Sequence, residues 1–178
     1  MNDGTARPAD GYLSDRVIVT LDDLLEPRER WRREGNVLVW TNGCFDLLHV
    51  GHVHLLEQAR RFGDILVVGV NSDESVRALK GPGRPIFPLP DRLRMLAALR
   101  APDHVISFAG LTPEAALADL QPDVHVKGED YAPPSHRPIP ERAIIESYGG
   151  RIEFVELLPS RSTSSVIEAI RERTRREG

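Results

Sequence analysis

The sequence predicts one doubly wound α/β domain, a parallel sheet covered by helices on both faces. Apolar runs of strand length alternate with segments of helical periodicity along most of the chain. These runs are apolar throughout, as expected for strands that are buried on both faces. With 178 residues, 40% of them hydrophobic, the chain has the size of a single domain. We expect that domain at residues 16–178, after a flexible N-terminal tail at residues 1–15.

Each expected element follows from a local pattern. Thr20 and Asp23 have capping-box spacing ahead of the first helix, and Pro27 is a candidate position for its interruption. Pro113 suits the first turn of a later helix. Helices are expected at residues 20–35, 50–62, 74–79, 91–100, 112–120, 139–148 and 162–176. Strands are expected at residues 36–41, 64–70, 104–108, 124–128 and 151–157.

Composition excludes several classes of function. The formal net charge of −4 and the pI near 5.9 leave no broad basic surface for nucleic acid or an anionic membrane. Cys44 is the single cysteine, so neither an internal disulfide nor a cysteine cage for zinc can form. The start of the chain has no apolar segment of signal-peptide type, and no apolar run is long enough to span a bilayer. We therefore expect a cytoplasmic protein that binds neither membrane nor nucleic acid.

Polar residues follow nearly every expected strand, at the edge of the sheet where such folds bind ligands. One group is the hydroxyl-rich run at residues 160–165, at the start of the last helix. Free N–H groups and the helix dipole favour an anion there, and Arg161 strengthens that interpretation. The alternative is a set of ordinary helix-capping residues.

The motif HVGH, residues 49–52, follows the first apolar strand. His49 and His52 are three residues apart and should face the same side of the first helical turn, while Gly51 leaves room for a ligand. Two imidazoles beside helix N–H groups can stabilise a phosphoryl group in transfer. Capping or packing histidines are one alternative. A zinc pair is another, although zinc needs a third ligand.

These motifs in this order support a resemblance to a known family. TNGCFDLLHVGHVHLLEQAR, residues 41–60, resembles the first strand and helix of the cytidylyltransferase-like nucleotidyltransferases, whose HxGH motif is paired with a serine- and threonine-rich motif near the C-terminus. STSS, residues 162–165, occupies that second position. Within this family, LKGPGRPIF, VKGEDY and LPSRSTSSVI are most similar to the adenylyltransferases of ADP-heptose synthesis. The similarity runs from about Val17 to Ile170.

The resemblance implies a Rossmann-like nucleotidyltransferase fold and a specific reaction. The phosphate oxygen of a sugar 1-phosphate, D-glycero-β-D-manno-heptose 1-phosphate in the adenylyltransferases of ADP-heptose synthesis, would attack the α-phosphorus of ATP and release pyrophosphate. No covalent enzyme intermediate is expected.

The resemblance also assigns roles by position. His49, His52 and Lys80 would be catalytic, and Arg84 and Arg92 would contact substrate phosphate. The residues expected to bind nucleotide are Thr41, Asn42, Gly43, Cys44, Phe45, Asp46, Gly51, Lys127, Gly128, Asp130, Ser162, Thr163 and Ser164.

Alternatives stay open for some of these residues. Arg84 could instead anchor a loop, Asp130 could be a turn residue, and Cys44 could be a small packing residue at a strand end. Asp73 is expected to cap a helix rather than bind ligand.

Magnesium is expected with ATP, because the triphosphate charge must be neutralised before another phosphate approaches. No metal ligand is identified, since the ion should be carried by the nucleotide. The expected partners are small molecules, ATP and the sugar 1-phosphate, with a homodimer suggested by relatives. Many relatives are fused to a sugar kinase, so a separate kinase is expected to supply the sugar phosphate here.

Two alternative functions remain. A glycerol 3-phosphate cytidylyltransferase would use the same chemistry, although VKGEDY and LKGPGRPI favour the heptose enzymes. A nucleotide-binding module without catalysis is the other, and the intact HVGH motif and Lys80 argue against it.

Overall fold

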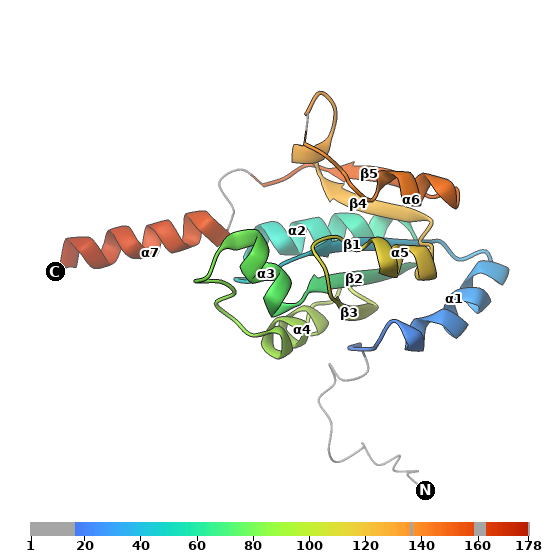
Figure 1. Cartoon of the computed structure of the whole chain (residues 1–178), viewed down its shortest axis with the longest axis horizontal. Helices are drawn as coiled ribbons and strands as arrows, with labels where there is room; N and C mark the ends of the chain where they lie inside the picture. The colour runs from blue at the N-terminus through green and yellow to red at the C-terminus, as the bar shows by residue number, and fades with distance from the viewer. Residues whose placement is uncertain (1–16, 136, 159–162, 178) are drawn as a thin grey trace, which may run out of the picture.

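Five parallel strands form the single sheet of the computed structural model, which describes residues 17–135, 137–158 and 163–177 (Figure 1). The tail expected at residues 1–15 lies outside the described part of the chain. The strands are β1 Leu38–Gly43, β2 Ile65–Asn71, β3 His104–Phe108, β4 Val124–Gly128 and β5 Arg151–Val155. Their order in the sheet is β3-β2-β1-β4-β5, and all neighbouring strands are parallel. The predicted doubly wound, Rossmann-like class is confirmed.

Helices connect the strands in the predicted alternation. They are α1 Asp22–Arg33, α2 Val50–Ala59, α3 Asp73–Lys80, α4 Leu89–Ala97, α5 Glu114–Leu120, α6 Arg142–Ser147 and α7 Thr163–Glu177. Two short 3-10 turns, η2 Arg60–Phe62 and η3 Glu129–Tyr131, follow α2 and β4. Figure 1 shows α7 extending away from the sheet. None of the helices in the described ranges has both the length and the apolar character needed to cross a bilayer.

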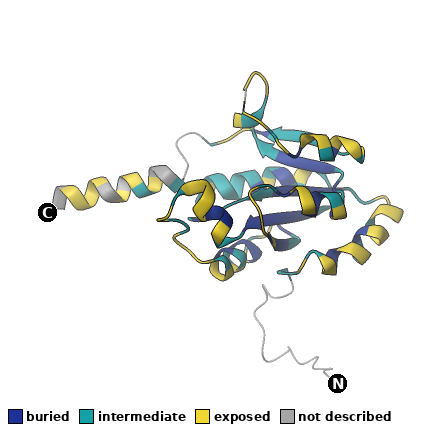
Figure 2. Ribbon diagram, viewed as in Figure 1, coloured by how far each residue is buried: buried dark blue, intermediate teal, exposed yellow. Residues whose placement is uncertain are grey.

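The sheet has an apolar core on each face, because successive strand residues point to opposite sides. In β1, Val39 packs with residues of α2 and α4, whereas Leu38 and Trp40 pack with residues of α1, α5 and α6. Figure 2 accordingly shows buried strands between helices whose outer faces are exposed. Burial on both faces accounts for the continuous apolar runs in the sequence.

The capping box predicted at the first helix is confirmed, whereas the interruption considered at Pro27 is not observed. The Thr20 N–H donates to the Asp23 carboxylate at 2.8 Å, and the Asp23 N–H donates to the Thr20 hydroxyl at 3.3 Å. Helix α1 continues through Pro27. The buried Arg28 fastens the helix there by donating to the carbonyls of Leu120 and Gln121.

Helix α6 is shorter than predicted and begins at Arg142 instead of Ile139. Pro140 accounts for the difference, because a residue before proline is disfavoured in the helical region. Residues 137–141 therefore remain a loop beside the carboxyl end of β4.

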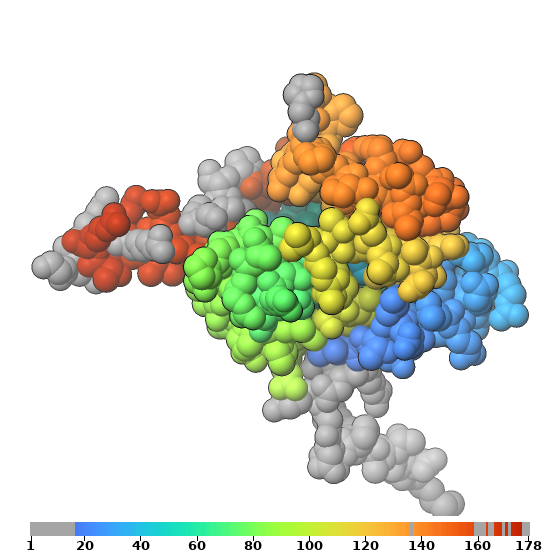
Figure 3. Space-filling view, viewed as in Figure 1, coloured from blue at the N-terminus to red at the C-terminus, as the bar shows by residue number. Residues whose placement is uncertain are grey.

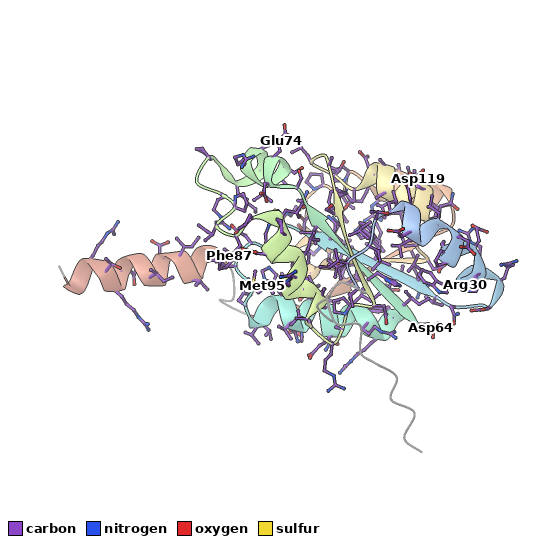
Figure 4. All side chains as sticks on the ribbon, turned by 90° about the horizontal axis from the view of Figure 1, so that it is seen from below. Arg30, Asp64, Glu74, Phe87, Met95 and Asp119 are labelled. Atoms are coloured by element: carbon purple, nitrogen blue, oxygen red, sulfur yellow. The ribbon has the colours of Figure 1, made fainter. Side chains whose placement is uncertain are left out.

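The strand order reverses between β1, the central strand, and its neighbour β4. In this class of fold, ligands bind outside the carboxyl ends of the strands at this reversal. In Figure 4, Glu74 and Phe87 lie at the end of the molecule where α7 begins, and Arg30 and Asp64 lie at the opposite end. The α3 and α7 end is the one to which the strands point.

Candidate active site

A cavity of about 1010 Å³ lies outside the carboxyl ends of β1 and β4. Figure 3 shows the surface hollowed between the green, yellow and orange segments of the chain. The residues expected at the site that line the cavity are Thr41, Asn42, Gly43, Cys44, Phe45, Asp46, His49, Gly51, His52, Lys80, Arg84, Lys127, Gly128, Asp130 and Thr163. The structure thus brings together residues from four separate segments of the sequence.

We call residues 41–52 the histidine turn, because its two histidines form one face of the cavity. His49 lies just before α2 in an extended conformation, and its carbonyl accepts from the His52 N–H at 2.9 Å. The rings of His49 and His52 stack with centroids 3.8 Å apart, and the Phe45 ring lies 5.2 Å from His52. The spacing in the sequence correctly predicted that the two histidines face the same side of the helix.

Both histidines of the histidine turn are neutral at physiological pH. Burial lowers the pKa of His49, and burial, with a smaller contribution from His49, lowers the pKa of His52 to about 4. A neutral imidazole offers one N–H donor and one acceptor nitrogen. The Nδ1 atoms of both rings are buried without a hydrogen-bond partner among the described residues. The pair can therefore donate to a phosphate oxygen without holding a fixed positive charge.

The rest of the histidine turn is held by its own side chains. The Thr41 hydroxyl donates to the Val126 carbonyl at 3.0 Å, which ties β1 to β4. The Asn42 side chain accepts from the Trp40 indole at 3.2 Å. Phe45 has a φ of 46°, in the left-handed region that side chains other than glycine rarely adopt. This local backbone turns the chain from the strand toward the histidines.

Asp46 joins the histidine turn to the loop between α3 and α4. Its buried carboxylate accepts from the Ile86 N–H at 2.7 Å and the Phe87 N–H at 3.1 Å, and it pairs with Arg84. The loop-anchor alternative for Arg84 therefore matches the geometry, although Arg84 also lines the cavity. Lys80, at the end of α3, is exposed. No carboxylate in the described ranges forms an ion pair with it.

Contrary to the prediction from the sequence, Arg92 does not lie where it could contact substrate phosphate. Its side chain is wholly buried and does not line the cavity. The guanidinium donates to the carbonyls of Phe87, Cys44 and Asn71 and pairs with Asp73 at 2.8 Å. Four of its five N–H donors thus bind residues that support the site, which corrects the expectation that Arg92 reaches substrate.

Asp73 also differs from expectation, because it pairs with Arg92 and does not cap α3. The cap is Ser72, whose hydroxyl accepts from the Ser75 N–H at 3.2 Å.

We call residues 127–141 the ion-pair segment, because its cations meet carboxylates of the same segment. Lys127 pairs with Glu141, whose side chain is 2% exposed. Asp130 pairs with Arg137, and the Arg137 guanidinium lies 3.9 Å from the centroid of the Tyr131 ring. The structure is compatible with both alternatives for Asp130, a turn residue and a ligand-binding residue, because Asp130 lies in the 3-10 turn η3 and lines the cavity.

Gly128 is required by the close packing of the ion-pair segment. A Cβ atom at this position would lie 2.6 Å from the Asp130 carboxylate and 3.0 Å from Leu157. Any larger residue would displace the carboxylate from the end of β4.

The cavity residues that were not predicted from the sequence include Asn71, Tyr131, Arg137 and Glu141. Asn71 ends β2 and Tyr131 follows β4, so both lie at the strand ends where the sequence predicted ligand-binding polar residues. Arg137 and Glu141 lie in a proline-rich loop without a local pattern.

The start of α7 reaches the cavity through one described hydroxyl. Thr163 lines the cavity and donates to the Leu47 carbonyl at 3.3 Å. Ser162 lies outside the described residues, and so does the side chain of Ser164. Their predicted contacts with nucleotide stay predictions.

The described part of the chain contains no cluster of three or more His, Cys, Asp or Glu side chains suited to a metal ion. The cavity carboxylates of Asp46, Asp130 and Glu141 are already paired with cations. The magnesium expected with ATP stays a prediction.

Comparison with known sequences identifies the family. The cytidylyltransferase-like family model matches residues 40–168. Bifunctional protein HldE of Syntrophotalea carbinolica is 48% identical over 158 residues, covering 89% of this chain and 31% of that protein. Bifunctional protein HldE of Acidiphilium cryptum is 48% identical over 165 residues, covering 93% of this chain and 33% of that protein. The chain thus spans about a third of the length of these relatives.

A solved structure agrees with the sequence matches. The lipopolysaccharide core biosynthesis protein from Thermoplasma volcanium has a TM-score of 0.56 and 28% identity to this chain, and the match covers 70% of this chain and 98% of that one. The matched family region includes the histidine turn, Lys80, the ion-pair segment and the start of α7. The chain therefore belongs to the cytidylyltransferase-like family of nucleotidyltransferases.

Proposed function

We propose that the chain transfers the adenylyl group of ATP to D-glycero-β-D-manno-heptose 1-phosphate. The observation that supports this most directly is the stacked His49–His52 pair at the start of α2, facing a cavity that also receives Lys80. The motifs LKGPGRPIF and VKGEDY support a sugar 1-phosphate as the acceptor. The name of the solved neighbour, a lipopolysaccharide core biosynthesis protein, also points to sugar chemistry.

In this reaction, an oxygen of the sugar 1-phosphate attacks the α-phosphorus of ATP. A new phosphorus–oxygen bond forms, the bond from the α-phosphorus to the bridging oxygen breaks, and pyrophosphate leaves with the bonding electron pair. The acceptor is already an anion, so the enzyme needs no base to activate it. The protein's task is to position the two substrates and to stabilise the negative charge.

The histidine turn supplies the donors for that task. Neutral His49 and His52 donate N–H groups to the phosphate oxygens, and the free N–H groups at the start of α2 favour the same anion. Lys80 adds a mobile positive charge at the transferring group. Magnesium supplies further charge neutralisation when it arrives bound to ATP.

Assembly and supply of substrate extend the proposal. We propose a homodimer and an upstream sugar kinase that provides the sugar 1-phosphate. The curated relatives are named as bifunctional proteins, which is compatible with a second activity in the same process.

The test is pyrophosphate release with Mg²⁺, in which ATP, CTP, GTP and UTP are each combined with heptose 1-phosphate and with glycerol 3-phosphate. Release that requires ATP and the heptose is the expected result. Release with CTP and glycerol 3-phosphate would make the chain a glycerol 3-phosphate cytidylyltransferase. Nucleotide binding without turnover on either acceptor would indicate a binding module.

A further inference from the structure

The two ends of the cavity differ in how their cations are balanced. At the end formed by the histidine turn and α3, Lys80 is exposed and forms no ion pair within the described ranges. At the end formed by the ion-pair segment, Lys127 faces Glu141 and Arg137 faces Asp130. One end therefore offers positive charge to a ligand, and the other is polar but nearly neutral.

Glu141 is the buried partner of Lys127 at the end of the cavity formed by the ion-pair segment. Its residue is 1% exposed, yet it lines the cavity beside Lys127, whose side chain is 12% exposed. A carboxylate buried to this extent needs a cation against it to remain charged.

His125 does not supply that cation. Its Nε2 atom lies 3.6 Å from the Glu141 carboxylate, and its ring is wholly buried. Burial, and secondarily the charge of Lys127, hold the pKa of His125 well below its usual range, so the ring is neutral. Lys127 alone compensates Glu141 among the described residues, and Glu141 in turn fixes the position of the Lys127 ammonium.

This pairing decides which chemical groups suit that end of the cavity. An entering phosphate would meet the Glu141 carboxylate together with the Lys127 ammonium, so attraction and repulsion nearly cancel. A hydroxyl group can accept from the ammonium and donate to the carboxylate at the same time. The Tyr131 ring, 5.0 Å from the Lys127 ammonium, lies beside this pair in the cavity wall.

We propose that Glu141 is a positioning residue that holds and neutralises Lys127, so that this end of the cavity selects the uncharged, hydroxyl-bearing part of the acceptor and rejects a second phosphate. The inference rests on the proposed function in one respect, because it takes the acceptor to be a sugar phosphate. It concerns binding selectivity, so it can be tested without turnover.

The test compares two probes, glucose 1-phosphate and glucose 1,6-bisphosphate, by calorimetric titration into the full chain with Mg²⁺ and a non-hydrolysable ATP analogue. Wild type should bind the bisphosphate no more tightly than the monophosphate. Glu141→Gln removes one negative charge and leaves the Lys127 ammonium free to bind the second phosphate. The preference for the bisphosphate should then rise by about tenfold, the size of one charge-assisted hydrogen bond.

Two variants separate this effect from a general change in charge. Glu146→Gln makes the same substitution five residues later, in α6, where Glu146 forms an exposed ion pair with Arg142, and it should leave the preference unchanged. The double variant Lys127→Met with Glu141→Gln removes the freed ammonium and should return the preference to that of wild type. Thermal unfolding of every variant checks that the fold is retained.

Failure of this inference can be told apart from failure of the proposed function. If the preference does not rise in Glu141→Gln, or rises equally in Glu146→Gln, the inference is wrong even where wild type releases pyrophosphate. If it rises as expected while no acceptor supports turnover, the selectivity stands and the proposed reaction is wrong. If Glu141→Gln does not fold, Glu141→Asp replaces it, because the shorter side chain withdraws the carboxylate from Lys127 by one methylene. The preference for the bisphosphate should then rise by less than in Glu141→Gln. The inference would also be overturned if the preference for the bisphosphate did not rise in Glu141→Asp, or if neither probe bound to the protein.

Discussion

The histidine turn and the ion-pair segment face the same cavity from neighbouring strands, but they meet it with opposite arrangements of polar groups. In the histidine turn, buried nitrogens of His49 and His52 have no partner among the described residues. In the ion-pair segment, Lys127 and Arg137 each have a carboxylate partner. The first region places two neutral imidazole rings beside the cavity, and the second has used its charges internally.

The difference indicates a division of labour in recognition. Unpartnered donors beside a helix N-terminus suit the phosphates, whose charge increases in the transition state. Paired charges provide both donors and acceptors without net charge, which suits hydroxyl groups. Changes in the first region should therefore affect rate, and changes in the second should affect acceptor choice.

The largest expected effect is a loss of stability at Arg92, which lies in neither region but supports the residues around the site. Arg92→Met should lower the free energy of unfolding by about 3–5 kcal/mol, because it removes the buried cation from Asp73 and leaves three carbonyls without their donor. Urea unfolding at neutral pH measures the change.

The control for this prediction is Arg142→Met, which breaks an exposed ion pair on α6. Its effect on unfolding should be within about 0.5 kcal/mol. If Arg92→Met had the unfolding free energy of wild type but bound phosphate more weakly, Arg92 would be a substrate contact as the sequence predicted. The structural role assigned to it here would then be wrong.

The next effect concerns the histidine turn itself. His49→Ala and His52→Ala should each reduce kcat by about 100- to 1000-fold, as expected for the loss of a donor to the transition state. Steady-state pyrophosphate release measures the rate, and circular dichroism checks the fold.

A matched control is His54→Ala, because His54 lies on the same helix but does not line the cavity. Its rate should remain within about twofold of wild type. Equal loss of rate in all three variants would assign the histidines to the stability of α2 instead of to catalysis.

The same comparison explains how much the sequence could predict. The histidine turn is a local pattern, because HVGH follows an apolar strand directly and the three-residue spacing fixes the side that His49 and His52 face. The strands were equally predictable, since burial on both faces makes them continuously apolar.

The ion-pair segment has no such signal. Lys127 and Glu141 are 14 positions apart and meet only because the proline-rich loop returns to the end of β4. Arg92 was misassigned for a related reason, since its partners come from three segments that the sheet brings together. Contacts of this kind depend on tertiary structure, and residue type alone cannot distinguish a buried arginine from one that binds substrate.

A third prediction uses pH to probe the burial of the histidine turn. The pKa of His52 is about 4 in the folded state and near 6.5 in the unfolded state. The unfolded chain therefore binds the proton more readily, so the contribution of His52 to stability is complete above pH 6.5 and is lost as the pH falls toward 4. Between pH 7.5 and 5.0 this loss should be about 2 kcal/mol.

Other histidines of the chain contribute to the same trend, so a variant isolates His52. In His52→Gln, urea unfolding should lose about 2 kcal/mol less than wild type over that pH range. Parallel curves for the two proteins would mean that His52 is already solvated in the folded state. The histidine turn would then lack the low-dielectric character that distinguishes it here.

The smallest expected effect lies at the outer edge of the ion-pair segment. Arg137 and Asp130 form an ion pair whose side chains are 49% and 40% exposed, in contrast to the buried Lys127–Glu141 pair. Arg137→Ala should therefore change the free energy of unfolding by less than about 1 kcal/mol. The guanidinium also covers the Tyr131 ring, so its removal should expose that ring and raise the quenching of tyrosine fluorescence by acrylamide. A loss of several kcal/mol instead would show that the outer pair supports the fold as the inner pair does, and the contrast between an exposed and a buried pair within this segment would not hold.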